Sequence, residues 1–414
     1  MLFIEYTAEQ LRAFLAQIAV INSADFPYDH SRAALSEIHD FFESNVSLLK
    51  ESEASTDAAI ARQTCKEIQQ NLEEYIDIIG FIFRSTNIRN AFEFHAPILE
   101  LARNVLGNDT KLVLSSEWDS SPFTYKPFTT PPEFVFIGLP AFLSATAFIL
   151  PVAGHEIGHH IWEELGLKSE FFPQIQGELK VLAIKKKALI NQINPELNKE
   201  IEQIEDVKVF DNLKLSALKK CEEIFSDFVG LRIFGESFLH TCHYLLASNV
   251  EPILDHDFPP LEQRAKTLGE VAKQMLGLAP IQDFFDDLSN NAPMTDLKED
   301  SKLSEDYLIQ DLTNEVAESL ANELLVYAKN SLNEKNIPLP DDIEAERIYN
   351  QFKKIVPATN CNNFADIISA GWRARLDPKL WHDVDYKQNR KLAILNDLVL
   401  KTIEVWEFET KTKV

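Results

Sequence analysis

Two histidines and a glutamate share one five-residue stretch, as His155, Glu156 and His159. On a helix, histidines at i and i+4 project from one face, where both can bind a zinc ion at about 2.0–2.1 Å. Glu156 then lies near the open coordination position, where a general base can take a proton from a water molecule that the metal activates. The spacing therefore predicts zinc-assisted hydrolysis. The alternative is a helix whose histidines are ordinary, partly buried polar residues.

An acidic pair about 60 positions later supplies groups that the histidines alone lack, at Glu223 and Asp227. Surrounding apolar residues recur at helical spacing, so both carboxylates are expected on one helix face. Glu223 would complete a site that holds one Zn²⁺ per chain and leaves the fourth position to water. Asp227 would accept the other ring N–H of a ligand histidine and fix its tautomer. The alternative is a solvated acidic face, although the neighbouring phenylalanines favour burial, and a buried carboxylate needs a cation.

Taken together, His155-Glu156-x-x-His159 and Glu223-x-x-x-Asp227 resemble the gluzincin branch of the zincin zinc metallopeptidases. In that branch the third ligand is a glutamate on a later helix, and an aspartate follows one turn on. The resemblance implies a zincin-like catalytic core, a peptide or protein substrate, and Glu156 as the catalytic base.

A second likeness, to the CAAX-prenyl peptidase and HtpX-type families, lies in the Phe-Pro-Pro-Leu-Glu-Gln-Arg segment that ends at Arg264. In those families a histidine precedes a proline and an arginine follows. Here Phe258 holds the position of the histidine, and the nearest histidine is His256. His256 or Tyr244 is therefore a candidate to stabilise the oxyanion of a tetrahedral intermediate. Arg264 is a candidate to hold a substrate carboxylate or an active-site acid.

Helical segments are expected to position these groups. The gluzincin resemblance covers roughly residues 134–268, and within it residues 141–150 and 152–165 are predicted to be helical, with a proline between them. Gly154 and Gly158 lie four positions apart, which leaves one side of the second helix bare for close packing or approach to a site.

Two short strands are predicted ahead of the motif helix, at residues 111–114 and 134–137. The second strand, extended to residue 139, is a candidate free edge for β-addition of an extended peptide, which would place a scissile carbonyl over the metal. The alternative is a plain core strand.

The segment between the zinc ligands, residues 172–220, is predicted to be an inserted helical hairpin. It could gate the cleft or bind a protein partner, and the alternative is a scaffold arm. Its first helix carries a heptad-like seam with spacings of three and four, apolar at all but one position: Ile175, Leu179, Leu182, Lys186, Leu189 and Ile193.

The 414-residue chain is predicted to be mainly α with a small β-sheet, an α+β fold in which a zincin-like core is flanked by helical regions. We expect an N-terminal helical region at 1–107. The catalytic core with its hairpin follows at 108–280. An acidic linker and a C-terminal helical region complete the chain at 281–414.

The net charge limits the classes of partner that the protein can bind, and the cysteines indicate its compartment. The net charge of −25 makes nucleic acid and anionic membranes poor partners. The four cysteines are scattered without a CxxC pair, which favours a reducing compartment. The first residues show no basic segment followed by an apolar run, so no signal peptide is visible. We therefore expect a cytoplasmic protein.

One stretch is long enough to raise the question of a membrane span. Phe134 to Gly154 is 21 residues without a charge. Prolines, glycine and hydroxyl residues interrupt it, and it lacks flanking Lys or Arg. A buried strand followed by the front of the motif helix is the favoured interpretation.

Three hypotheses follow from the sequence. The first is a zinc-dependent peptidase that uses Glu156 as general base. The second is a catalytically inactive zincin-like scaffold that acts as a zinc-containing protein-binding module. The third is an intramembrane metalloprotease based on the uncharged stretch 134–154.

Overall fold

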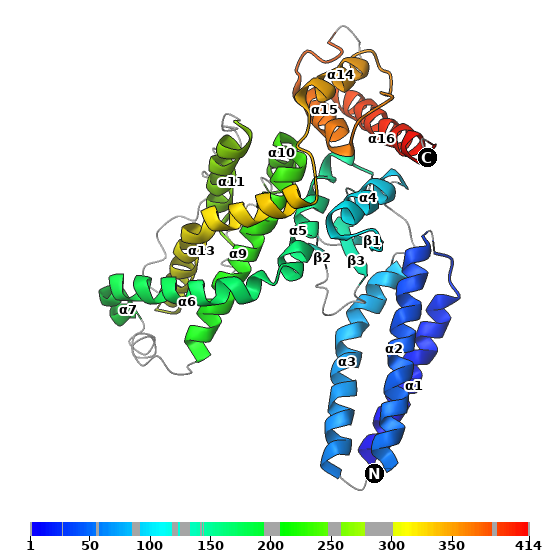
Figure 1. Ribbon diagram of the computed structural model, residues 1–414, viewed down its shortest axis with the longest axis vertical. Helices are drawn as coiled ribbons and strands as arrows, with labels where there is room; N and C mark the ends of the chain where they lie inside the picture. The colour runs from blue at the N-terminus through cyan, green and yellow to red at the C-terminus, as the bar shows by residue number, and fades with distance from the viewer. Residues whose placement is uncertain are drawn as a thin grey trace. The chain divides into compact units, whose positions relative to one another are not determined.

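The computed structural model is mainly helical with one small sheet, which confirms the expected fold class (Figure 1). It divides into two compact units, Met1–Thr146 and Ala147–Val414, and each is described by itself. Neither unit coincides with the core expected at 108–280, because the strands belong to the first unit and the zinc-motif helices to the second. The structure describes residues 2–26, 28–54, 58–84, 92–117, 123–124, 133–140, 143, 145–193, 208–246, 258–277, 301–382 and 387–412.

The first unit begins with three long helices that lie side by side, α1 (Leu2–Asn22), α2 (Asp29–Ala54) and α3 (Ala58–Arg84) (Figure 1). Each helix turns an apolar stripe towards the other two, which is the usual way for amphipathic helices to bury their apolar surface. Buried residues of the bundle include Leu11, Ile18, Leu35, Ile38, Phe42, Ile68 and Leu72.

A small sheet completes the first unit. After η1 (Phe92–Phe94) and α4 (His95–Leu106) come β1 (Lys111–Glu117), β2 (Phe123–Thr124) and β3 (Phe134–Pro140). The strand order is β1-β3-β2, with β1 parallel and β2 antiparallel to β3.

The middle position of β3 corrects the expectation of a free edge. Strand β1 pairs with β3 along its whole length, and β2 pairs with Ile137 and Gly138 on the other side. All seven residues of β3 are buried. An uncharged run of this kind fills a strand that is covered on both faces, so the plain core strand is the correct interpretation.

The second unit is built around α9 (Lys208–Phe234), which packs against α5 (Val152–Glu164) and α13 (Ser301–Glu334). Helix α13 lies in the part of the chain expected to form the acidic linker and C-terminal helical region, and it packs along the helix that carries Glu223. The other elements of the unit are η4 (Ala147–Ile149), α6 (Leu167–Lys185), α7 (Lys187–Ile193), α10 (Glu236–Leu246), α11 (Leu261–Leu276), α14 (Asp342–Phe352), α15 (Phe364–Leu376) and α16 (Gln388–Thr412).

The inserted hairpin is only partly within the described residues, since positions 194–207 lie outside them. Its first arm is divided into α6 and α7, and α6 packs on α9 and α13. The seam is buried at Ile175, Leu179 and Leu182. Lys186 instead forms ion pairs with two acids of α13, and Leu189 is exposed. The described arm is therefore attached to the body of the unit by both apolar and ionic contacts.

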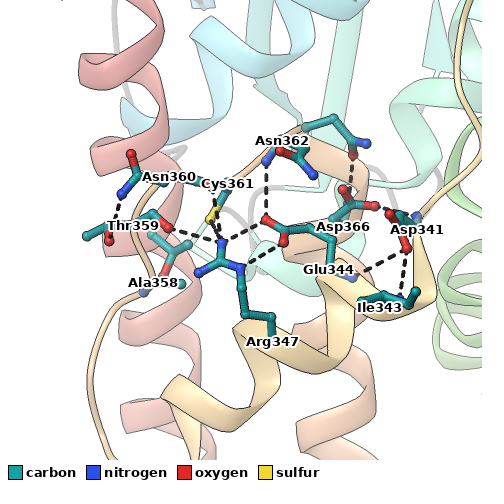
Figure 2. Close-up of polar contacts among 12 residues, drawn as sticks. Asp341, Ile343, Glu344, Arg347, Ala358, Thr359, Asn360, Cys361, Asn362 and Asp366 are labelled. Carbon is teal, nitrogen blue, oxygen red and sulfur yellow. Dashed lines mark hydrogen bonds and ion pairs between the residues drawn. The ribbon is translucent and has the colours of Figure 1, made fainter.

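Helices α14 and α15 and the loop between them are joined by polar contacts (Figure 2). Arg347 donates two hydrogen bonds to the Glu344 carboxylate and others to the carbonyls of Thr359 and Asn360. The Asp366 carboxylate accepts a hydrogen bond of 2.7 Å from the backbone N–H of Asp341, the N-cap of α14. These bonds fix the connection between the two helices.

The uncharged stretch 134–154 forms β3, η4 and the first turn of α5 where it is described. Where residues 141–150 are described, they form 3₁₀ and turn structure in place of the expected helix, with η4 at Ala147–Ile149. Within the described parts of the chain, every helix is too short or too polar to cross a bilayer.

Candidate metal centre

Close contact between α5 and α9 brings the motif residues together. A Cβ atom on Gly154 would lie 3.1 Å from the Cα of Gly230, and one on Gly158 would lie 2.6 Å from the Cα of Ser226. Side chains at these glycines would push the two helices apart. The helices run antiparallel, because residues 154 and 158 of α5 meet residues 230 and 226 of α9. The bare helix side expected from the two glycines is thus used for packing.

His155, His159 and Glu223 form a compact group of metal-binding atoms. The two histidine Nε2 atoms are 3.3 Å apart, and they lie 3.4 and 3.7 Å from the carboxylate oxygens of Glu223. Ligands about 2.0–2.1 Å from a tetrahedral zinc ion are about 3.3 Å from one another, so the donor spacing fits such an ion. Among the described residues, these three are the group of His, Cys, Asp and Glu side chains that could hold a metal.

The opposite ring nitrogens contact carboxylates. His155 Nδ1 lies 2.9 Å from Asp227, and His159 Nδ1 lies 2.9 Å from Glu222. A carboxylate at Nδ1 accepts a hydrogen bond from the ring N–H, which leaves Nε2 with a lone pair for a metal. Asp227 therefore lies where the sequence placed it. Glu222 was not predicted from the sequence. Its role follows from the antiparallel order of α5 and α9, which brings the residue before Glu223 to the second histidine.

Arg264, on α11, binds Asp227 through two hydrogen bonds. Its Nε and Nη2 atoms lie 2.9 and 2.7 Å from the two carboxylate oxygens. Of the two roles considered for Arg264, this geometry matches an arginine that holds an acid of the cluster rather than a ligand. Arg264 thus acts on His155 through Asp227, as a positioning residue.

Glu156 is buried in α5, one residue after the first histidine. Burial raises the pKa of its carboxyl, and the nearby His155 and His159 act in the opposite direction. A carboxylate with a raised pKa is a stronger base than one in water.

The charges of the cluster favour a bound cation. Burial alone would lower the pKa of His155, but Asp227 and Glu223 outweigh burial and raise it to about 10. Burial opposes ionisation of Glu223, yet its contact with His155 lowers its pKa. Four buried carboxyl groups, including those of Glu156 and Glu222, are thus gathered here with Arg264 and with His155, whose raised pKa favours its protonated form. A divalent cation would supply the missing positive charge.

The candidates for oxyanion stabilisation are not brought together with this cluster in the described structure. His256 lies outside the described residues. Phe258 is 47% exposed. Tyr244, on α10, is also exposed, and its ring lies 4.6 Å from the guanidinium carbon of Arg375.

No family model, curated protein or solved structure matches the chain. The resemblance to gluzincins stays a prediction. The functional argument therefore depends on the residues and contacts described above.

Proposed function

We propose that the protein is a zinc-dependent peptidase that hydrolyses peptide bonds with Glu156 as general base. One observation carries the proposal. The Nε2 atoms of His155 and His159 and the carboxylate of Glu223 converge at tetrahedral spacing, while both Nδ1 atoms are held by other carboxylates. Two imidazoles and one carboxylate are a common ligand set of catalytic zinc, which keeps one position open.

Zinc bound there would polarise the substrate carbonyl and lower the pKa of water to about 7. Glu156 accepts the proton of the attacking water, because burial has raised the basicity of its carboxylate. It then transfers that proton to the leaving amine. Asp227 and Glu222 hold the ligand histidines in one tautomer, and Arg264 holds Asp227.

The experiment is a comparison of Glu156→Gln with the wild-type protein. We expect Glu156→Gln to retain one zinc per chain and to lose about 10²–10⁴-fold in peptide cleavage, because only the base is removed. Zinc is measured by elemental analysis, and cleavage with a diverse peptide library read by mass spectrometry. Glu164→Gln is the control, since Glu164 is an exposed carboxylate at the end of the same helix. Unchanged turnover in Glu156→Gln would refute the proposal.

A second candidate is an inactive zincin-like scaffold that binds zinc and a protein partner. It is favoured by Phe258, which replaces the histidine of the resembled peptidases and is exposed to solvent. The hairpin at 172–220 is the proposed partner surface. The two functions separate in the experiment above, because the scaffold would contain zinc and cleave no peptide in the library.

We also place the protein in the cytoplasm. The four cysteines are all buried free thiols, which suits a reducing compartment. Fractionation of cells that express the tagged full-length chain tests this location, and recovery from an oxidising compartment would contradict it.

A further inference from the structure

An arginine in the second unit lies within a cage of aromatic rings. The guanidinium carbon of Arg375, in the last turn of α15, is 4.8 Å from the ring centre of Phe148, 4.6 Å from Tyr244 and 4.9 Å from Trp372. These rings come from η4, α10 and α15, so folding assembles the cage from three separate segments. We call this group the aromatic cage.

The surroundings of Arg375 differ from those of its neighbour on the same helix. Arg373 donates hydrogen bonds to Asp342 and Glu346 of α14. In the part of the chain that the structure describes, no carboxylate pairs with Arg375, and the Tyr244 side chain lies against its guanidinium. A guanidinium stays charged and carries five N–H donors, so most donors of Arg375 remain available to a ligand.

The cage suits an anion that approaches in the plane of the guanidinium. Aromatic rings stabilise a cation that lies over their faces, whereas a carboxylate binds a guanidinium edge through two parallel hydrogen bonds. A further donor lies in the same cage. The indole N–H of Trp372 is buried and has no hydrogen-bond partner among the described residues. Tyr244 is partly exposed, so the cage borders solvent.

We propose that the aromatic cage binds one carboxylate group through Arg375. The site offers one positive charge in a chain with a net charge of −25, which disfavours anions of higher charge such as phosphate. The carboxylate has two possible sources, the C-terminus of a peptide or a small carboxylic acid. The site does not depend on zinc or on hydrolysis, so it can be tested separately from the peptidase.

The test is isothermal titration calorimetry of the full-length protein with four probes at constant ionic strength. These are N-acetyl-tetra-alanine with a free C-terminus, its C-terminal amide, sodium acetate and inorganic phosphate. Mass spectrometry checks that the peptide stays intact. We expect the free acid to bind at least about tenfold more tightly than the amide. Binding of acetate with similar affinity identifies small carboxylic acids as the source, and its failure to bind identifies a peptide.

Two variants and a matched control test the role of Arg375. We expect Arg375→Gln to abolish the preference for the acid over the amide. Arg375→Lys keeps the charge but lacks the planar pair of donors, so it should weaken binding about tenfold. Arg373→Gln, two residues away, should bind as the wild type does. Thermal unfolding checks that each variant folds, and Arg375→Lys still decides the question if the glutamine variant does not.

Three results would overturn the inference. They are equal affinity for acid and amide, binding by Arg375→Lys that matches the wild type, and tighter binding of phosphate than of any carboxylate.

Discussion

His159 is held by a carboxylate that the sequence motif does not include. Its Nδ1 lies 2.9 Å from Glu222, which is buried next to the ligand Glu223. We expect Glu222→Gln to lower zinc affinity by about 10–100-fold, since a neutral amide holds the imidazole less strongly. Competition with a chelating dye measures this affinity. Glu262→Gln, an exposed glutamate of α11, is the control, and equal zinc affinity in the two variants would contradict the role of Glu222.

Asp366 carries a pH-dependent contribution to stability. Burial raises the pKa of its carboxyl to about 6 despite the hydrogen bond from Asp341 (Figure 2). The folded protein therefore holds a proton here that the unfolded chain, with a pKa near 3.9, releases. This contribution is present below about pH 4 and is lost as the pH rises through about 6.

The variant Asp366→Asn tests this titration. It cannot ionise, so its free energy of unfolding relative to the wild type should rise by up to about 3 kcal/mol between pH 4 and pH 7. Urea unfolding at several pH values measures the difference. A difference that is the same at both pH values would show that Asp366 does not titrate in this range.

At the scale of elements, the contact between α5 and α9 depends on glycine. We expect Gly158→Ala to lower the free energy of unfolding by about 1–3 kcal/mol and to weaken zinc binding, because the new methyl group would lie 2.6 Å from the Cα of Ser226. Gly177→Ala, on α6, is the matched control. Nothing lies within 4 Å of its added Cβ, so the free energy of unfolding of this variant should rise by about 0.5–1 kcal/mol. Chemical unfolding with and without zinc measures both, and equal effects would contradict the contact.

Local signals in the sequence mark the ends of some elements. Helix α15 begins at Phe364 and ends at Leu376, because Asn363 caps its first turn and Asp377-Pro378 follows its last. Helix α5 likewise begins directly after Pro151 and ends just before Gly166.

Features that depend on the tertiary arrangement could not be predicted in this way. The carboxylate of Glu222 is one more acid in an acidic sequence until the order of the two helices is known. Within the described residues, strand β3 lies between two partners, because β1 pairs with it along its whole length and β2 pairs with Ile137 and Gly138. The spacing of Lys186 assigns it to an apolar seam, yet in the structure it forms ion pairs with acids of α13.

At the scale of the whole molecule, every residue of the candidate metal centre lies in the second unit. We expect the fragment 147–414 to bind one zinc ion with the affinity of the full chain, and the fragment 1–146 to bind none at this affinity. Elemental analysis after gel filtration measures both. A shorter fragment, 147–277, lacks α13 and leaves the apolar surface of α9 uncovered, so it should show no cooperative unfolding. Loss of zinc from 147–414 would show that the first unit contributes to the site.

The touching backbones of α5 and α9 also bear on the choice of ion. Their separation cannot shrink, and the hydrogen bonds of Asp227 and Glu222 resist outward rotation of the imidazoles. Calcium prefers oxygen ligands at about 2.3–2.6 Å and would require a wider opening. The two glycines that let the helices touch, Gly154 and Gly158, thus make the cluster discriminate between cations by radius.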